Sequence, residues 1–460
     1  MSTEHSRRAH EILKNREKVT RHDKTFWGVR EGHDRMMHQL PEWEQLRDHA
    51  SDIKKHTITH LADYLEMFTS QLESRGVIVH FAKDAAELNE MVYGILETHK
   101  VKKMVKSKSM LTEECGLNDY LIGRGIDVVE TDLGERILQL MHRKPAHIVM
   151  PAIHITKEEV AECFEKEGIS PKHGNSDPTY LTYCARKSLC HEFEEAGAGL
   201  TGCNFGVAKT GDIVVCTNEG NADMTTSMPK LHIVTMGIEK LVPDYDSLAV
   251  FQRLLCRCGT GQPTTSFTSH FRQARPGAEM HVILLDNGRS NILADPEHWE
   301  TLKCIRCGAC MNTCPVYRRS TGASYTYFIP GPIGVNLGML NNPRKYCDNV
   351  SACSLCLSCD NVCPAEVKPG SQIYVWRQSL DAIGKANKLK KFMSEGMSTL
   401  FDHPALYHTA VWFAPLANYV PECMTHYSNL NPWGIGHTKP EFAEESFHRL
   451  WAKGKVTADK

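Results

Sequence analysis

The second half of the chain is organised by two stretches, Cys304-Ile-Arg-Cys307-Gly-Ala-Cys310-Met-Asn-Thr-Cys314-Pro315 and Cys353-Ser-Leu-Cys356-Leu-Ser-Cys359-Asp-Asn-Val-Cys363-Pro364. Both follow C-x2-C-x2-C-x3-C-P, the spacing of bacterial ferredoxins that hold two iron–sulfur clusters. Three thiolates at this spacing can surround one face of an Fe4S4 cube. The fourth cysteine is turned away by its proline and reaches the other cube. We therefore predict two [4Fe-4S] clusters with crossed ligands.

The crossed arrangement assigns three cysteines of one stretch and one of the other to each cluster. The first cluster would be held by Cys304, Cys307, Cys310 and Cys363, and the second by Cys353, Cys356, Cys359 and Cys314. The alternative is zinc, because paired Cys-x-x-Cys also builds tetrahedral thiolate sites. A zinc ribbon needs only two cysteines per knuckle, however, so the repeated four-cysteine pattern favours iron–sulfur clusters.

Length and charge limit the remaining functions. The chain has 460 residues and a formal charge of -2, which predicts two or three domains and no nucleic-acid partner. No apolar run approaches the roughly 18 residues of a spanning helix, and the first residues show no signal-peptide core. We expect a cytoplasmic protein without a transmembrane segment, which would reach the inner membrane only peripherally, through partners.

The chain contains 18 cysteines, and those outside the two motifs have no standard ligand spacing. Cys256 and Cys258, and the group Cys184, Cys190, Cys203 and Cys216, could bind something further. The simpler interpretation is that they are buried free thiols, which behave as small hydrophobic residues. A reducing cytoplasm suits both interpretations.

Residues 1–60 are rich in charge and histidine, and we interpret them as an N-terminal segment of surface helices. None of their eight histidines belongs to a His-x-x-x-His pair backed by a glutamate, as a metal-binding helix would require. We therefore expect these histidines to face solvent or a partner.

Residues 61–290 alternate short β-branched runs with amphipathic helices, which predicts an α/β domain with a mostly parallel sheet covered on both faces. Strands are predicted over residues 76–81, 102–106, 126–130, 147–150, 200–208, 212–217, 231–236, 264–270 and 280–285. Helices are predicted over residues 84–96, 135–142, 181–195 and 244–255, with another starting at Thr156. Asp84 with Glu87, and Thr156 with Glu159, are capping-box pairs.

The segment Gly197-Ala-Gly199-Leu-Thr-Gly202 matches the dinucleotide fingerprint by letter. That fingerprint must follow a strand and open a helix, so that the pyrophosphate meets helix N–H groups. Here a helix precedes and a strand follows, so we reject a nicotinamide or flavin site.

Residues 291–385 form the predicted two-cluster domain, which is mainly helical, and residues 386–460 form a helical tail rich in aromatic residues. Tyr325, Tyr327 and Phe328 lie between the two motifs and predict an ordered insert that shields one cluster. Pro440 is expected to start an amphipathic final helix that carries Phe442, Phe447 and Trp451. The tail's aromatic residues, Tyr427 and Trp433 among them, suit internal packing and a subunit interface equally.

Several stretches resemble the lactate utilisation protein B family, in which an LUD domain precedes a two-cluster module. They are Lys106-Ser-Lys-Ser-Met110 with Glu113 and Glu114, Glu130-Thr-Asp-Leu-Gly-Glu135, His147 with Pro151-Ala-Ile-His154, Gly199-Leu-Thr-Gly-Cys-Asn204, Thr217-Asn-Glu-Gly-Asn221, Met236-Gly-Ile-Glu-Lys-Leu-Val-Pro243 and Cys304 to Tyr317. The resemblance covers nearly the whole chain. It departs at Cys203, Cys256 and Cys258, where the family usually has uncharged residues other than cysteine.

The resemblance implies a fold like the α/β domains of sugar-phosphate isomerases and CoA-transferases. It also implies a role in oxidising L-lactate to pyruvate, which allows lactate to serve as a carbon source, together with two partner proteins of the same pathway. The chemistry agrees with a subunit that relays electrons to an acceptor, because cubes carry single electrons and no flavin or nicotinamide motif is present.

A binding site for lactate or pyruvate is expected at the carboxyl end of the sheet, where α/β folds bind anions. Its candidates are Lys106, Ser107, Lys108, Thr217, Asn218, Glu219 and Asn221. The alternative for residues 217–221 is a buried polar turn that holds the sheet edge.

Two other functions of the protein stay open. One is a transferase or isomerase-like enzyme that uses Glu130, Asp132 or Glu219 and has regulatory clusters. The other is a cluster subunit of a quinone-linked oxidoreductase for another hydroxy acid.

Overall fold

The computed structural model describes residues 4–380, 382–384, 388–421 and 441–455. The chain divides into two compact units, one from Glu4 to Gln378 and one formed mainly by the tail from Ser379 onward. Within the described residues, every helix is too short or too polar to cross a membrane.

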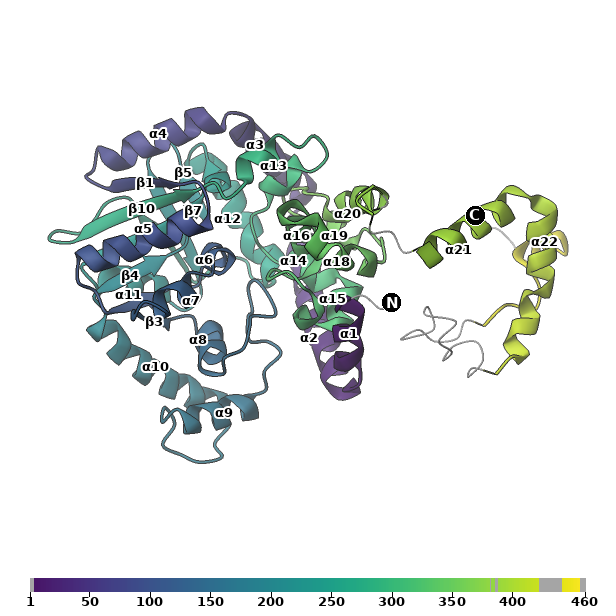
Figure 1. Cartoon of the computed structure of the whole chain (residues 1–460), viewed down its shortest axis with the longest axis horizontal. Helices are drawn as coiled ribbons and strands as arrows, with labels where there is room; N and C mark the ends of the chain where they lie inside the picture. Colours follow the sequence, from purple (N-terminus) through teal and green to yellow (C-terminus); the bar gives the residue numbers. More distant parts are fainter. Residues whose placement is uncertain (1–3, 381, 385–387, 422–440, 456–460) are drawn as a thin grey trace. The chain divides into compact units, whose positions relative to one another are not determined.

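The larger unit contains a six-stranded sheet in which all strands are parallel, as the alternating pattern predicts. Its order is β1 (Ile78–Ala82), β10 (Glu279–Leu285), β7 (Leu231–Gly237), β4 (Ala198–Thr201), β2 (Lys103–Lys106) and β3 (Asp127–Glu130). The strands run in the same direction, so their carboxyl ends meet at one edge of the sheet (Figure 1). This edge positions the cavity described below.

Helices cover both faces of this sheet, because alternate strand residues are apolar on each side. One face packs against α5 (Ala85–Thr98), α6 (Met110–Cys115) and α7 (Leu117–Ile122). The other packs against α4 (Leu61–Glu73), α10 (Pro178–Glu195) and α11 (Asn221–Ser227). The Asp84 side chain caps α5 by accepting from the Glu87 N–H, whereas Glu87 itself accepts from the Lys83 N–H. Helices α8 (Leu133–Leu140) and α9 (Lys157–Lys166) pack with α10, and α9 begins with the predicted Thr156–Glu159 capping box.

A second sheet has the order β8 (Leu241–Val242), β5 (Phe205–Val207), β6 (Asp212–Thr217) and β9 (Phe267–Phe271). The single strand predicted over 200–208 is therefore wrong, since β4 belongs to the first sheet and β5 to the second. The chain changes sheet at Asn204, whose side chain accepts a hydrogen bond from the Cys216 N–H in β6. Helix α12 (Tyr245–Gly259) packs Phe251 on Phe205 of β5.

The strand predicted over 147–150 is also wrong, because these residues form a buried turn between Pro145 and Pro151. His147 Nδ1 accepts hydrogen bonds from the N–H groups of Val149 and Met150, both at 3.0 Å, which closes the turn. An apolar β-branched run does not by itself distinguish a strand from a buried loop.

The glycines of the rejected dinucleotide motif serve packing. The motif lies after α10 and runs into β4, the order that excludes a fingerprint. A Cβ atom on Gly199 would lie 1.9 Å from the Thr225 carbonyl oxygen, so glycine lets α11 approach β4.

The region after α13 (Arg289–Leu293) is helical, as predicted. It contains η2 (Trp299–Lys303), α14 (Ala309–Thr313), α15 (Pro315–Ser320), η3 (Gly322–Ser324), α16 (Gly331–Asn341), α17 (Pro343–Tyr346), α18 (Asp348–Ala352), α19 (Ser358–Asn361) and α20 (Pro369–Ser379). The segment between the cysteine motifs is ordered around buried Tyr325 and Ile333.

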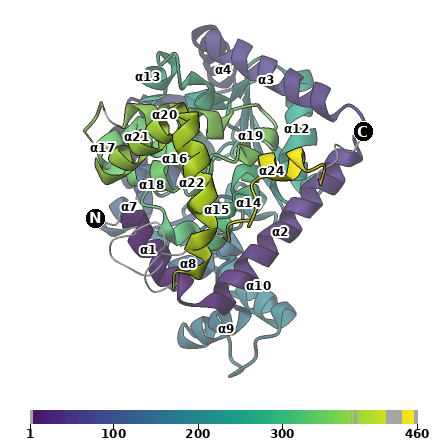
Figure 2. The same cartoon turned by 90° about the vertical axis from the view of Figure 1, so that its right-hand side faces the viewer.

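The N-terminal segment consists of α1 (Glu4–Leu13), α2 (Arg16–His38) and α3 (Trp43–Thr59), and it joins the α/β part to the cysteine-rich part. Helix α2 lies beside α12, α14 and α15 (Figure 2). The expectation of exposed histidines is wrong for His5, His22 and His33, which are buried. His22 Nδ1, for example, is 2.8 Å from the Arg318 carbonyl oxygen.

The tail contains α21 (Lys388–Asp402), α22 (Pro404–Phe413), η4 (Ala414–Tyr419) and α24 (Phe447–Ala452). The final helix begins at Phe447, not near Pro440, because Ser446 caps it by accepting from the Arg449 N–H. Tyr427, Trp433 and Pro440 lie outside the described residues.

Candidate functional site

The two cysteine motifs fold into the same loop. Arg306 and Leu355, at matching positions, both have left-handed backbone conformations with φ of 62° and 56°. Gly308 and Leu357, again at matching positions, have φ of 84° and 57°. Left-handed φ is costly for residues other than glycine. The left-handed conformation occurs at the same two positions of both motifs, which indicates that the two loops serve the same role.

Backbone N–H groups of these loops point at the sulfur atoms. The Arg306 N–H lies 3.4 Å from Cys304 Sγ, and the Leu355 N–H lies 3.3 Å from Cys353 Sγ. The Val367 N–H lies 3.3 Å from Cys363 Sγ. Hydrogen bonds of this kind stabilise thiolates and tune the potential of an iron–sulfur cluster.

Cysteine side chains of the two motifs lie near one another. A small cavity is lined by Cys304, Cys307, Cys310 and Cys363. Burial, together with the neighbouring thiols of Cys353 and Cys356, raises the pKa of Cys314 to about 11. The fourth cysteine of each motif therefore lies near the first cysteines of the other.

The spacing of the sulfur atoms argues against zinc. With Zn–S bonds of ~2.3 Å, four sulfurs around one zinc ion lie roughly 4 Å apart. In the described part of the chain, two groups of three ligand side chains bring their ligand atoms within 4.8 Å of one another, and neither includes a cysteine. No three cysteine sulfurs of the described residues lie at this spacing, so they are not arranged around a single zinc ion.

A cavity of about 270 Å³ lies at the carboxyl edge of the parallel sheet. Of the residues expected to bind an anion, six line it: Ser107, Lys108, Thr217, Asn218, Glu219 and Asn221. Lys106 does not. Its ammonium group is fully buried 2.7 Å from Glu130, so its charge is neutralised beneath the cavity.

Several buried polar groups of this cavity have no hydrogen-bond partner among the described residues. They are the hydroxyls of Ser107, Thr217 and Thr235 and the Nη1 of Arg306. Unpaired buried polar groups are costly and therefore indicate a ligand or water. Their presence favours a binding site over a polar turn that only holds the sheet edge.

Three cations that sequence reasoning missed, Lys240, Arg289 and Arg306, also line the cavity. Burial lowers the pKa of Lys240, although neighbouring Glu239 counteracts this effect. Glu239 itself is held by Arg289 Nε at 2.5 Å, and Arg289 also contacts Glu114 at 3.0 Å. Lys240 lies in one of the stretches that carry the family resemblance, and this was the feature of the sequence that could have identified it as a site residue.

Glu219 is the acid of this cavity that titrates near neutral pH. Burial raises its pKa to about 7, and the nearby Asp132 carboxylate adds to this increase. Its Oε2 accepts a hydrogen bond from the Leu133 N–H at 3.0 Å, which fixes the carboxyl group. The group can therefore hold or release a proton at physiological pH.

Of the additional cysteines singled out in the sequence, Cys184, Cys256 and Cys258 are buried, Cys203 and Cys216 are half-buried, and Cys190 is exposed. Cys203, Cys216 and Cys256 line the cavity, and burial raises the pKa of both Cys203 and Cys216 to about 12. Cys258 is fully buried near the thiols of Cys363 and Cys307. The expectation of buried thiols is therefore confirmed for Cys184, Cys256 and Cys258 and wrong for Cys190.

The cavity and the first cysteine loop share a wall. Arg306 and Cys307 line both the 270 Å³ cavity and the small cysteine-lined cavity. His147 connects the two parts further, since its Nε2 lies 3.0 Å from Asn312 Oδ1 in α14. A ligand in the sheet-edge cavity would therefore lie next to the first group of cysteines.

Comparison with known proteins gives three matching domains. Residues 65–289 match the LUD domain, residues 300–367 the 4Fe-4S dicluster domain, and residues 380–456 the C-terminal domain of lactate utilisation protein B. The chain thus carries an iron–sulfur domain after its α/β domain.

Curated relatives align over most of the chain. Lactate utilization protein B of Oceanobacillus iheyensis is 38% identical over 90% of this chain and 84% of the relative. The protein of the same name from Bacillus pumilus is 41% identical over 82% and 81%. The uncharacterized electron transport protein YkgF of Escherichia coli K12 is 35% identical over 93% and 91%. The chain therefore belongs to the lactate utilisation protein B family.

Proposed function

We propose that this protein is the iron–sulfur electron-transfer subunit of a multi-protein system that oxidises L-lactate to pyruvate. Two [4Fe-4S] clusters would be bound with crossed ligands, the first by Cys304, Cys307, Cys310 and Cys363, and the second by Cys353, Cys356, Cys359 and Cys314. The names of the relatives support the pathway, and the name of the Escherichia coli relative supports electron transport.

The shared wall between the two cavities carries this proposal. Arg306 belongs to the first cysteine loop and also lines the cavity that holds Lys240 and Glu219. A carboxylate bound there would meet two cations and the free hydroxyls of Thr217 and Thr235. Small 2-hydroxy and 2-keto acids have the charge and the hydrogen-bonding groups that such a cavity selects.

The chain's own residues have limited chemical tasks in this scheme. Oxidation of lactate to pyruvate removes a hydride equivalent from Cα and releases the hydroxyl proton, and a partner with a flavin, nicotinamide or quinone would take the hydride equivalent. The clusters, when bound, supply one-electron transfer toward an acceptor. Lys240 and Arg306 would orient the substrate carboxylate, and Glu219, in its deprotonated form, would accept the hydroxyl proton.

Anaerobic purification with the native partners tests the proposal. We expect about eight irons and eight sulfides per chain, and reduction of the clusters by L-lactate only when partners are present. Cys310→Ser should lose about half of the iron, whereas Cys347→Ser, which lies in the same region outside both motifs, should keep all of it. Full iron content in Cys310→Ser, or zinc in place of iron, would refute the cluster assignment.

The crossed ligands have their own test. In the crossed arrangement, Cys363→Ser and Cys304→Ser damage the same cluster, so their dithionite-reduced paramagnetic resonance spectra should match. Cys353→Ser should instead match Cys314→Ser. If Cys363→Ser matched Cys353→Ser, the ligands would not be crossed.

A second function is favoured by one observation, the neutral-range pKa of Glu219. It is a transferase or isomerase-like activity in which Glu219, with Asp132 or Glu130, performs acid–base chemistry. Turnover of a CoA ester or sugar phosphate by the protein alone, without cluster reduction, would establish it. Reduction by glycolate or glycerol phosphate in place of lactate would instead assign the subunit to another quinone-linked oxidoreductase.

A further inference from the structure

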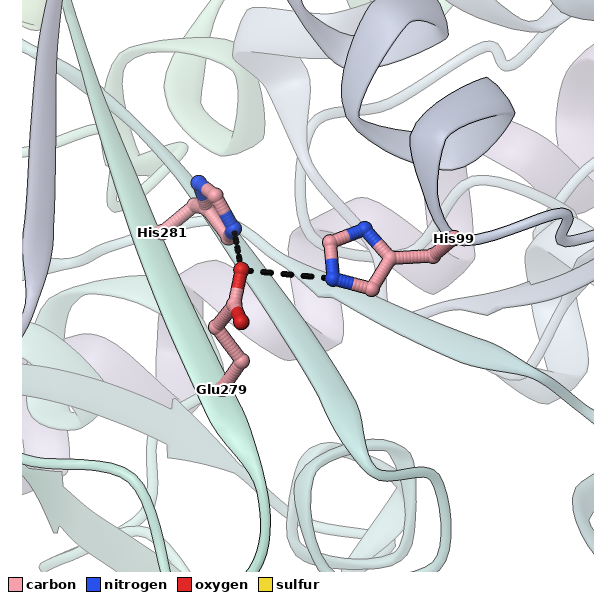
Figure 3. A group of neighbouring side chains, drawn as sticks. All are labelled: His99, Glu279 and His281. Atoms are coloured by element: carbon pink, nitrogen blue, oxygen red, sulfur yellow. Dashed lines mark hydrogen bonds and ion pairs between the residues drawn. The ribbon is translucent and has the colours of Figure 1, made fainter.

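Three side chains that can bind a metal converge at the opposite edge of the parallel sheet, where the strands begin. His99 follows α5 as its C-terminal cap, and Glu279 and His281 lie at the start of β10. Residues two apart on a strand point to the same face, so Glu279 and His281 both face His99 (Figure 3). This edge is remote from the cavity and from the cysteine motifs.

The three ligand atoms have the separation that a single ion requires. Glu279 Oε1 lies 2.6 Å from His281 Nε2 and 3.3 Å from His99 Nε2. All three lie within 4.8 Å of one another. Bonds of ~2.0–2.1 Å to nitrogen and oxygen in tetrahedral zinc sites place ligand atoms about 3.3 Å apart. Small side-chain movements would therefore complete the geometry.

The other ring nitrogens of both histidines are already engaged. His99 Nδ1 lies 2.9 Å from the Ile95 carbonyl oxygen, and His281 Nδ1 lies 3.0 Å from His80 Nε2. A carbonyl oxygen only accepts, so His99 Nδ1 carries the hydrogen, and Nε2 is the atom of His99 that can bind a metal ion. Metal-binding histidines usually have this second hydrogen bond to a carbonyl group.

We propose that His99, Glu279 and His281 form a binding site for a divalent transition-metal ion of the zinc class. Two imidazoles and one carboxylate suit zinc better than magnesium or calcium, which prefer oxygen ligands. Three protein ligands leave a further coordination position open. His99 and Glu279 also line a surface cavity of about 600 Å³ together with Lys100, Lys102 and Lys230. These lysines would favour an anion or hydroxide as the remaining ligand.

Zinc titration of the full-length, cluster-loaded protein tests this site. After dialysis against a weak chelator, bound zinc is counted by mass spectrometry while the visible band of the clusters is monitored. We expect one zinc per wild-type chain, and affinity at least 10-fold lower in His99→Ala and in Glu279→Gln. His173→Ala is the matched control, because His173 forms an exposed pair with Glu165 but belongs to neither three-ligand group found among the described residues. It should bind zinc like the wild type.

X-ray absorption at the zinc edge then identifies the ligands. The site should show only nitrogen and oxygen scatterers near 2.0 Å, whereas zinc captured by cysteines would show sulfur near 2.3 Å. Replacing His80 by glutamine should weaken binding roughly 10- to 100-fold, as loss of a supporting hydrogen bond does elsewhere. Equal zinc binding by the wild type and His99→Ala, or sulfur ligation in the wild type, would overturn the proposal. The cluster-based function would be unaffected by either result.

Discussion

At the scale of single residues, the cavity depends on a small number of buried charges. Lys240 contributes an ammonium group for which the described residues provide no hydrogen bond or ion pair within standard distances. We expect Lys240→Met to weaken binding of pyruvate or oxalate by about 10- to 100-fold, since a charged hydrogen bond contributes ~1.5–3 kcal/mol. Isothermal titration calorimetry measures this effect. The control is Lys209→Met, an exposed lysine outside the cavity, and equal losses in both variants would contradict the assignment.

Glu219 should make anion binding dependent on pH. Burial, and then the charge of Asp132, raises its pKa to about 7, so the carboxyl group is neutral below that pH and repels a bound anion above it. We expect the Kd for pyruvate to increase between pH 6 and pH 8, and to stay constant in Glu219→Gln.

The raised pKa of Glu219 should also make folding stability depend on pH. As the pH rises from the ordinary carboxyl pKa near 4.5 to about 7, the folded state becomes progressively less stable. The stability gained by Glu219→Gln should therefore be larger at pH 8 than at pH 4, as thermal melts at both pH values would show.

At the scale of elements, helix α11 packs closely against strand β4, and substitutions of glycine can test this packing. Gly199 leaves no room for a Cβ atom beside Thr225, so Gly199→Ala should lower the free energy of unfolding by ~2 kcal/mol or more. Gly94, in the middle of α5, has open space around its Cβ position. Gly94→Ala should therefore raise stability by about 0.5–1 kcal/mol. Denaturant titration measures both changes, and a tolerated alanine at 199 would contradict the close approach of α11.

At the scale of the whole molecule, the N-terminal helices hold the α/β part and the cysteine-rich part together. Phe26 of α2 is fully buried, 5.1 Å from the ring of His147 and 5.3 Å from that of Tyr317. Arg47 of α3 donates to the Cys363 carbonyl oxygen at 3.0 Å. Lys54 of the same helix donates to the Leu241 carbonyl oxygen at 3.3 Å. One N-terminal segment thus contacts both functional parts.

Removing this contact should therefore affect both parts together. We expect Phe26→Ala to cost about 3–5 kcal/mol, the usual range for a buried phenylalanine, and to lower the melting temperature of the α/β part and of the clusters in parallel. Circular dichroism and the visible cluster band report the two transitions. The neighbouring Trp27 is 49% exposed, so Trp27→Ala should have a small effect. A separate loss of the cluster band in Phe26→Ala would contradict the coupling.

Local sequence patterns determined much of this architecture. Capping residues such as Asp84 and Thr156 fixed helix starts because their bonds reach only three residues along the chain. The order of strands and helices predicted the parallel sheet, and the position of Ser107 after β2 predicted its place at the carboxyl edge. The cysteine spacing predicted the repeated loops, since each loop is closed within a few residues.

Tertiary structure decided what local patterns cannot contain. The Ile148–Val149 run has the composition of a strand, yet contacts made by His147 with distant Asn312 and with its own backbone place it in a turn. Lys106 was directed away from the cavity by Glu130, and Lys240 and Arg306 were brought into it from distant elements. Periodicity describes which residues avoid water, whereas charge pairing and the sharing of a cavity depend on side chains that meet only after the sheet and the cysteine loops have packed together.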